Sequence, residues 1–120
     1  KTATQVFEYI VEEGENDNGH HRKWSSGLLE QLVSDKLITA AINNKYGSLY
    51  QGVFAWTFPI QFLEKPEVVI CSKAQYGTGA SWGTVYTWSV SSADIRAFDT
   101  FSRASANEMR FTAYAKGKWK

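Results

Sequence analysis

Tyr76 and Trp82 are the residues whose setting in this chain best fits a binding chemistry. Both lie in KAQYGTGASWG, residues 73–83, a stretch with three glycines and no clear period. Exposed aromatic rings stack on the apolar face of a sugar while nearby polar groups bind its hydroxyls. We therefore predict that residues 73–83 form a loop that binds carbohydrate, because long irregular loops often carry function. The alternative is that both rings cap the core or pack on a neighbouring chain.

Four charged residues further along the chain are candidate partners for the hydroxyls of such a sugar. They are Asp94, Arg96, Asp99 and Arg103. An ordinary cross-strand ion pair is the alternative role for any two of them.

Signatures of catalysis are absent from the sequence. There is no GxSxG, HExxH or Walker motif, and these are the spacings that identify a nucleophile, a catalytic zinc or a phosphate loop. Asp94, Asp99 and Glu108 resemble the paired carboxylates of glycosidases. Acids in β-domains are more often solvated or ion-paired, however, so we expect no enzyme.

The two histidines, His20 and His21, are adjacent. On a strand they face opposite ways, so they do not chelate one ion within a single chain. A trimer axis would gather three copies of either residue, but exposed histidines at a hairpin edge are the favoured interpretation. We predict no metal and no cofactor.

The composition favours a single antiparallel β-domain. Aromatic residues make up 15% of 120 residues, with five Trp, six Tyr and seven Phe against one Met. Bulky aromatic residues are enriched in strands, and one small sandwich has limited room to bury them, so we expect oligomerisation. A net charge of +1 provides no strong field for nucleic acid.

Other features of the composition bear on where the chain resides. No apolar run approaches the roughly 20 residues of a membrane span, so we expect a soluble chain without membrane insertion and without a leader. The single cysteine, Cys71, lies in an apolar run and is expected to be buried and inert. The first residue is Lys1 rather than Met, which suggests a fragment of a longer protein.

Residues 51–72 are the stretch around which the chain is organised. Phe54, Trp56 and Phe58 alternate with small residues, the pattern of a strand with one buried face. Pro59 and Pro66 cannot donate to a ladder, so they predict a bend. Further strands are predicted over residues 5–12, 20–24, 28–33, 67–72, 84–91, 94–98 and 109–116, and residues 35–44 are open between helix and strand, with strand favoured.

Three segments of the chain carry a resemblance to a known family. They are RKWSSGLLEQ, WTFPIQFLEKPEVV and FTAYAKGKW, and together they resemble the C-terminal domains of bacteriophage and prophage tail fibres. The matching elements are a Ser-Gly-Leu turn, a Glu-Gln pair, a Phe-Pro-x-x-Phe strand and a final Ala-x-Gly-x-Trp, here Ser26 to Leu28, Glu30 with Gln31, Phe58 to Phe62 and Ala115 to Trp119. Leu32 and Val33 stand where many tail-fibre relatives have tryptophan and glycine.

The resemblance implies a small antiparallel β-sandwich similar to H-type lectins, assembled as a homotrimer. It further implies that the chain is the receptor-binding tip of a virion tail fibre, whose partner is a bacterial cell-surface polysaccharide. No lectin motif for sugar ligands matches TVYTWSVS, so the predicted site stays with Tyr76, Trp82 and the four charged residues. The alternatives are a structural trimerisation or folding-cap domain and a depolymerase fragment.

Overall fold

The computed structural model describes residues 7–74, 81–104 and 108–120. Every regular element within these ranges is a β-strand, which confirms the predicted all-β class. The strands are β1 (Ile10–Asn16), β2 (Gly19–Trp24), β3 (Leu28–Thr39), β4 (Asn44–Tyr46), β5 (Leu49–Thr57), β6 (Glu67–Ala74), β7 (Ser81–Trp88), β8 (Ser92–Asp99) and β9 (Glu108–Lys118).

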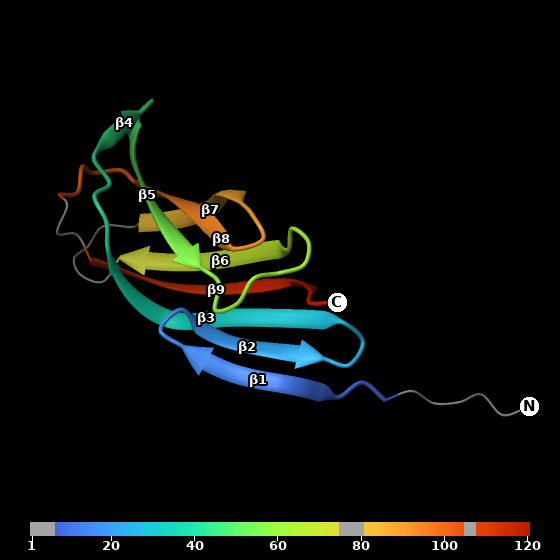
Figure 1. The fold of residues 1–120 in the computed structure, drawn as a ribbon. Helices are drawn as coiled ribbons and strands as arrows, with labels where there is room; N and C mark the ends of the chain where they lie inside the picture. The colour runs from blue at the N-terminus through green and yellow to red at the C-terminus, as the bar shows by residue number, and fades with distance from the viewer. Residues whose placement is uncertain (1–6, 75–80, 105–107) are drawn as a thin grey trace, which may run out of the picture.

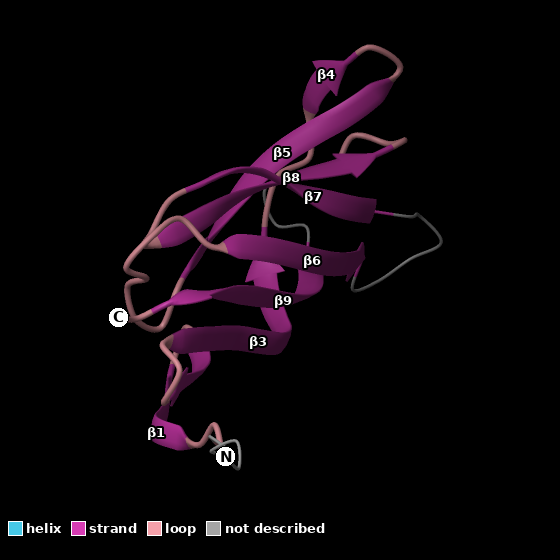
Figure 2. Cartoon of the chain, turned by 90° about the vertical axis from the view of Figure 1, so that its right-hand side faces the viewer, coloured by secondary structure: helices cyan, strands magenta, loops and turns pink. Residues whose placement is uncertain are grey.

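The strands form two antiparallel sheets, as the sequence predicts. One sheet has the order β1-β2-β3-β9-β6 and the other the order β4-β5-β8-β7 (Figure 1). In both views β6 lies beside β7, so the two sheets meet along these strands (Figure 2). No helix within the described part of the chain is long and apolar enough to cross a membrane.

The core lies where β3 and β9 of one sheet face β5 and β8 of the other. Along β5 the alternation is as predicted, because Trp56 is buried while Val53 and Ala55 point outward. The ring of Phe58 packs edge-on against the rings of Trp56 and Phe62, with centroids 5.0 Å and 5.1 Å apart, respectively. The stripe of aromatic residues is therefore part of the core. The buried residues of this core are Leu29, Val33, Trp56, Phe58, Phe62, Ala93, Ile95, Phe111, Ala113 and Ala115.

The residues between the two prolines form no strand, which confirms the predicted bend. Gln31 of β3 holds this bend, and its side chain is completely buried. Its Nε2 donates to the carbonyl of Ile60 at 2.8 Å, and the N–H of Ile60 donates back to Oε1 at 2.8 Å. A buried polar side chain needs such partners, so the Gln31 side chain fixes the path from β5 to β6.

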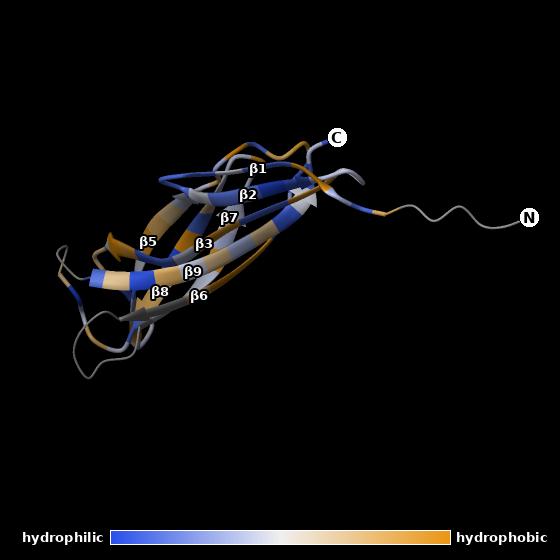
Figure 3. Cartoon of the chain, turned by 90° about the horizontal axis from the view of Figure 1, so that it is seen from below, coloured by the Kyte–Doolittle hydropathy of each residue, from blue (hydrophilic) through white to orange (hydrophobic). Residues whose placement is uncertain are grey.

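The first hairpin turns at Asp17 and Asn18, between Asn16 of β1 and Gly19 of β2. Gly19 has φ +131°, and a Cβ there would lie 2.3 Å from the carbonyl oxygen of Leu32, so only glycine fits. The predicted first strand, residues 5–12, was placed too early. β1 continues to Asn16, because Glu13 and Glu15, beyond the predicted end, pair with His20 and Arg22 of the polar strand β2, mostly blue in Figure 3.

The stretch over residues 35–44, which was ambiguous in the sequence, is strand up to Thr39. The pairing of β3 with β9 shifts between Val33 and Lys36, and Asp35 there has φ +49°. The N–H of Asp35 bonds the hydroxyl of Thr112 at 3.0 Å. This β-bulge lets one strand continue across a break in its hydrophobic alternation.

Two predictions about the middle of the chain are wrong. Cys71 is exposed rather than buried, and Val69 is 63% exposed, because β6 is the edge of its sheet and turns one face to solvent. The loop predicted over residues 73–83 is also wrong at both ends, since β6 extends to Ala74 and β7 begins at Ser81. Cross-strand pairing with β8 places Trp82 and Gly83 in a strand.

The residues that carry the tail-fibre resemblance gather at one end of the sandwich. Glu30 accepts hydrogen bonds from the indole of Trp24 at 2.6 Å and from the hydroxyl of Tyr114. A Cβ at Gly117 would lie 2.8 Å from the ring of Phe62, so that glycine makes room for the core. These residues therefore support the fold.

Candidate functional site

The outer face of the β4-β5-β8-β7 sheet is the candidate site. Along β8, Ala93, Ile95 and Ala97 are buried against the core, so Arg96 and Phe98 point to the opposite face. Cross-strand pairs bring neighbours onto this face, with Trp82 opposite Phe98 on one side and Val53 opposite Arg96 on the other. We call this surface the aromatic face; its residues are Tyr46, Val53, Trp82, Tyr86, Arg96 and Phe98.

Three rings cross the aromatic face from β7 to β4. Trp82 stacks on Phe98 with centroids 6.0 Å apart and planes 27° apart. Tyr46 contacts the same Phe98 with centroids 6.0 Å apart at 58°. Trp82 is 42% exposed and Tyr46 53% exposed, so the row presents open ring surface to solvent.

Arg96 lies between two tyrosines on the same face. Its guanidinium carbon is 3.8 Å from the ring centroid of Tyr86 and 5.8 Å from that of Tyr46, both within the range of a cation–π contact. The register between β7 and β8 shifts between Val85 and Thr87. This bulge makes Tyr86 the extra residue of its strand and places its ring over Arg96.

Asp94 lies two residues before Arg96 on the same face of β8, opposite Ala55. It lines a small cavity of about 120 Å³ with Thr87, Trp88, Ser89 and Ser92. Its carboxylate and the nearby hydroxyls are acceptors and donors suited to sugar hydroxyls. Asp94 is thus placed beside the aromatic face, as the sequence-based proposal requires.

Asp99 and Arg103 lie elsewhere and bond to each other. Asp99 is completely buried, and its carboxylate accepts from Arg103 Nε at 3.0 Å and from the N–H of Phe101 at 2.8 Å. The backbone of Arg103 forms a two-way bridge with Ile42, at 3.1 and 2.9 Å. The ion pair thus holds Arg103 against the end of β8, and the backbone bridge joins the segment after β8 to the segment after β3.

Of the predicted site residues, the structure thus brings Trp82, Asp94 and Arg96 to one face. Tyr76 lies outside the described residues. Tyr46 and Tyr86 were missed by sequence reasoning. Tyr86 belongs to a clear strand pattern, but the bulge that turns it toward Arg96 has no sequence signal such as a glycine.

The histidines lie on opposite faces of β2, as predicted. His20 bonds Glu13 at 2.7 Å, and His21 bonds Glu12 at 2.9 Å. Hydrogen bonds from His21 and then Lys23 lower the pKa of Glu12, and those from Arg22 and then His20 lower the pKa of Glu13. Among the described residues no group of three or more His, Cys, Asp or Glu side chains is placed to hold a metal ion.

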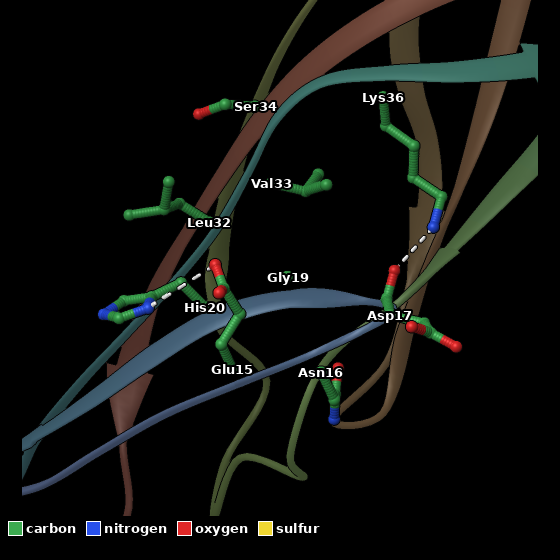
Figure 4. A pocket seen from close by; sticks show the side chains of 9 residues that line it. All are labelled: Glu15, Asn16, Asp17, Gly19, His20, Leu32, Val33, Ser34 and Lys36. Carbon is green, nitrogen blue, oxygen red and sulfur yellow. Dashed lines mark hydrogen bonds and ion pairs between the residues drawn. The ribbon is translucent and has the colours of Figure 1, made fainter.

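A second concavity of about 320 Å³ lies beside the first hairpin, between β2 and β3 (Figure 4). Its polar groups contact one another. The ammonium of Lys36 donates to the carbonyl of Asp17 at 2.6 Å, and His20 Nδ1 lies 4.0 Å from Glu15. The described residues that line this concavity include no Trp, Tyr or Phe ring on which a sugar could stack, so we place the candidate site on the aromatic face.

Comparison with solved structures gives the fold a precedent. The chain is similar to the P. aeruginosa R1 pyocin fibre comprising C-terminal residues 323–701, with a TM-score of 0.62 and 17% identity over 93% of this chain. It is also similar to an N-truncated R1-type pyocin tail fibre, with a TM-score of 0.61 and 15% identity over 93% of this chain and 86% of that one. No protein-family model and no curated protein matches the sequence.

The chain spans 28% of the length of the first of these fibres. At 15–17% identity the likeness is one of fold. It confirms the tail-fibre resemblance at that level, whereas the likeness to H-type lectins stays a prediction. This chain therefore has the fold of a domain found in pyocin tail fibres.

Proposed function

We propose that this chain is the receptor-binding domain of a tail fibre and that its aromatic face binds a glycan on the surface of a host bacterium. The observation that carries the proposal is the group of exposed rings on Trp82, Tyr86 and Tyr46, with Arg96 in contact with both tyrosines. The fold likeness to pyocin tail fibres supports the setting of a phage or pyocin particle. The fibre tip is the position in that particle at which the domain meets the host.

Ring surface and polar groups are combined on this face as sugar binding requires. Trp82, Tyr86 and Val53 are 42%, 56% and 56% exposed, a larger apolar surface than scattered single residues leave. The C–H face of a sugar stacks on such rings, while Asp94 and Arg96 bond its hydroxyls. An open sheet face suits an extended polysaccharide better than a small buried substrate.

The proposed activity is binding without chemical change of the glycan. Glycosidases place two carboxyl groups across the scissile bond, roughly 5 to 10 Å apart. Of the sequence's candidate carboxylates, Asp99 is buried and ion-paired with Arg103. Asp94 is on the opposite face of β8, since neighbours at odd spacing on a strand point to opposite faces. This arrangement favours a receptor-binding role over a depolymerase.

We further propose that three copies assemble, as the resemblance to H-type lectins and tail fibres implies. A homotrimer presents three equivalent aromatic faces, so linked sites gain from effective concentration. Weak contacts at each face then give firm attachment to a polysaccharide with repeating units.

The test is binding of the purified chain to an array of bacterial surface polysaccharides, with oligomer mass measured by light scattering. Trp82→Ala and Tyr86→Ala are expected to weaken binding with little change in melting temperature. Loss of a stacked ring removes about 1 kcal/mol beyond area burial, roughly tenfold or less at one site, and more in a trimer. Tyr9→Ala is the matched control, because Tyr9 is 63% exposed and lies near the other sheet.

The same experiment separates the structural alternative. If Trp82→Ala and Tyr86→Ala lower the oligomer mass, the aromatic face is a subunit interface and the domain is a trimerisation module. Unchanged glycan binding in both variants at unchanged mass would contradict the proposed site. Shortening of the bound polysaccharide would instead identify a depolymerase.

A further inference from the structure

Arg96 differs from the other arginines of the chain in its partners. Arg22, Arg103 and Arg110 form ion pairs with Glu13, Asp99 and Asp35, respectively. No described carboxylate pairs with Arg96, and its Nε is buried without a hydrogen-bond partner among the described residues. An unmet buried donor on a charged group is costly.

The two tyrosines leave Arg96 a defined direction in which to bond. Tyr86 at 3.8 Å and Tyr46 at 5.8 Å contact the guanidinium through their rings. The five N–H donors of arginine lie in the guanidinium plane, in a fork that matches the two oxygens of a carboxylate or a phosphate. A side-on pair of that kind uses Nε together with one Nη, so the unmet Nε is a donor that such a ligand needs.

We propose that the glycan bound by the aromatic face is acidic, and that Arg96 binds its carboxylate or phosphate group. This inference rests on the proposed function. The sugar ring stacks on Trp82, whose partner Phe98 is two residues from Arg96 on the same face of β8. The charged substituent then reaches Arg96 from the side of Phe98, away from Asp94.

Gln51 supports this direction of approach. It is paired with Phe98 across the sheet, diagonal to Arg96, and its Oε1 is buried without a partner among the described residues. The unmet acceptor thus belongs to a diagonal neighbour of the residue that carries the unmet donor. A sugar acid with a neighbouring hydroxyl satisfies both, since the hydroxyl donates to Gln51 while the acid accepts from Arg96.

The experiment compares each polysaccharide bound on the array with chemically altered forms of itself. Carboxyl reduction with carbodiimide and borohydride converts uronic acids into neutral sugars, and aqueous hydrogen fluoride removes phosphate. One of the two treatments is expected to lower affinity about tenfold to a hundredfold, the range for a charge-assisted hydrogen bond. Whichever treatment has this effect shows whether the acidic group is a carboxylate or a phosphate.

Variants connect that loss to one residue. Arg96→Gln is expected to bind the untreated glycan as weakly as the parent binds the treated one, and to lose its sensitivity to the treatment. Arg96→Lys keeps the charge but not the fork, and recovers only part of the affinity. Lys118→Gln makes the same charge change on the exposed end of the other sheet and is expected to bind like the parent.

The outcomes distinguish this inference from the function on which it rests. Binding that is lost in Trp82→Ala but survives both treatments would overturn the acidic ligand and leave a neutral glycan reader. If Arg96→Gln still binds the treated glycan more weakly than the untreated one, a residue other than Arg96 binds the acidic group. If the parent binds no polysaccharide on the array, the proposed function itself fails. If Arg96→Gln lowers the melting temperature, its binding is not informative. The affinity of the parent for treated and untreated glycans then tests whether the ligand is acidic.

Discussion

The carboxamide of Gln31 and the backbone of Ile60 form a closed pair of hydrogen bonds, each 2.8 Å long, inside the core. The two residues are 29 positions apart, one in β3 and the other in the bend that follows β5. Their pairing holds the bend after β5, so that Phe58 and Phe62 meet edge-on beneath it. One polar side chain thus secures the junction of the two sheets.

Gln31 is one of the residues that carry the tail-fibre resemblance, and its structural role explains why that resemblance predicts the fold better than the site. Its motif residues bond and pack with one another, as Glu30 does with Trp24 and Tyr114. The indole of Trp119 donates to the carbonyl of Trp24 at 2.8 Å. These residues maintain the sandwich and leave the aromatic face free to differ.

Gln31→Met is expected to destabilise the protein, because methionine fills the space but satisfies neither group of Ile60. Leaving a buried donor or acceptor unpaired costs about 1–3 kcal/mol. A loss near 2 kcal/mol lowers the melting temperature by roughly 8 °C in a chain of this size. Gln61→Met, at an exposed position of the same bend, is the control and is expected to melt with the parent. Equal melting of the two variants at matched concentration would refute the role of Gln31.

Gly117→Ala is expected to cost about 1–3 kcal/mol, the usual range for overpacking a core. The added Cβ would lie 2.8 Å from Phe62 and 3.2 Å from Pro66. Phe62→Leu makes room, so the two substitutions together are expected to cost about 1 kcal/mol less than the sum of their separate effects. Urea unfolding of both single variants and the double variant measures this coupling. Simple additivity would show that the ring is not what excludes the methyl group.

Trp56→Ala and Trp82→Ala form a matched pair with opposite expected effects. Trp56 is 2% exposed and its indole donates to the carbonyl of Asn18 at 2.8 Å, so its removal is expected to cost about 3–5 kcal/mol. Trp82 is 42% exposed, and its removal is expected to change stability far less. Calorimetry on both variants provides the comparison. Melting of Trp56→Ala like the parent would mean that the stripe is not core.

Alkaline pH is expected to weaken the fold through Tyr114. Burial and the hydrogen bond to Glu30 raise the pKa of Tyr114 to about 12, above its ordinary value near 10. Stability from this group is therefore fully present below pH 10 and is lost as pH rises through about 12. Tyr114→Phe removes this term. Unfolding curves for parent and variant between pH 8 and pH 12 are expected to differ in slope only above pH 10, and parallel curves would contradict the assignment.

The sequence predicts most of the strands because their alternation is local. β5, β8 and β9 follow a period of two, and the structure confirms them. The errors arise where neighbours in space decide. Cys71 lies in an apolar run but is on an edge strand, and Trp82 lies among glycines but pairs with Phe98 across the sheet.

Part of the candidate site was predictable on the same grounds. The strand pattern that contains Arg96 places it on the face opposite Ile95, and Trp82 stands out by type. Tyr86 was not predictable, since its direction depends on a bulge whose register is fixed by β8. Tyr46 was not predictable either, because its contact with Phe98 joins strands that are far apart in the chain.

The five indole N–H groups provide the most direct test of the aromatic face. Those of Trp24, Trp56, Trp88 and Trp119 donate to groups within the protein, whereas Trp82 has no hydrogen-bond partner among the described residues and lies on the aromatic face. Each gives a separate signal in a ¹⁵N-labelled NMR spectrum, assigned by single Trp→Phe variants. Titration with a polysaccharide fragment bound on the array is expected to shift the Trp82 signal and leave the other four in place. Shifts confined to the other four would contradict glycan binding at this face.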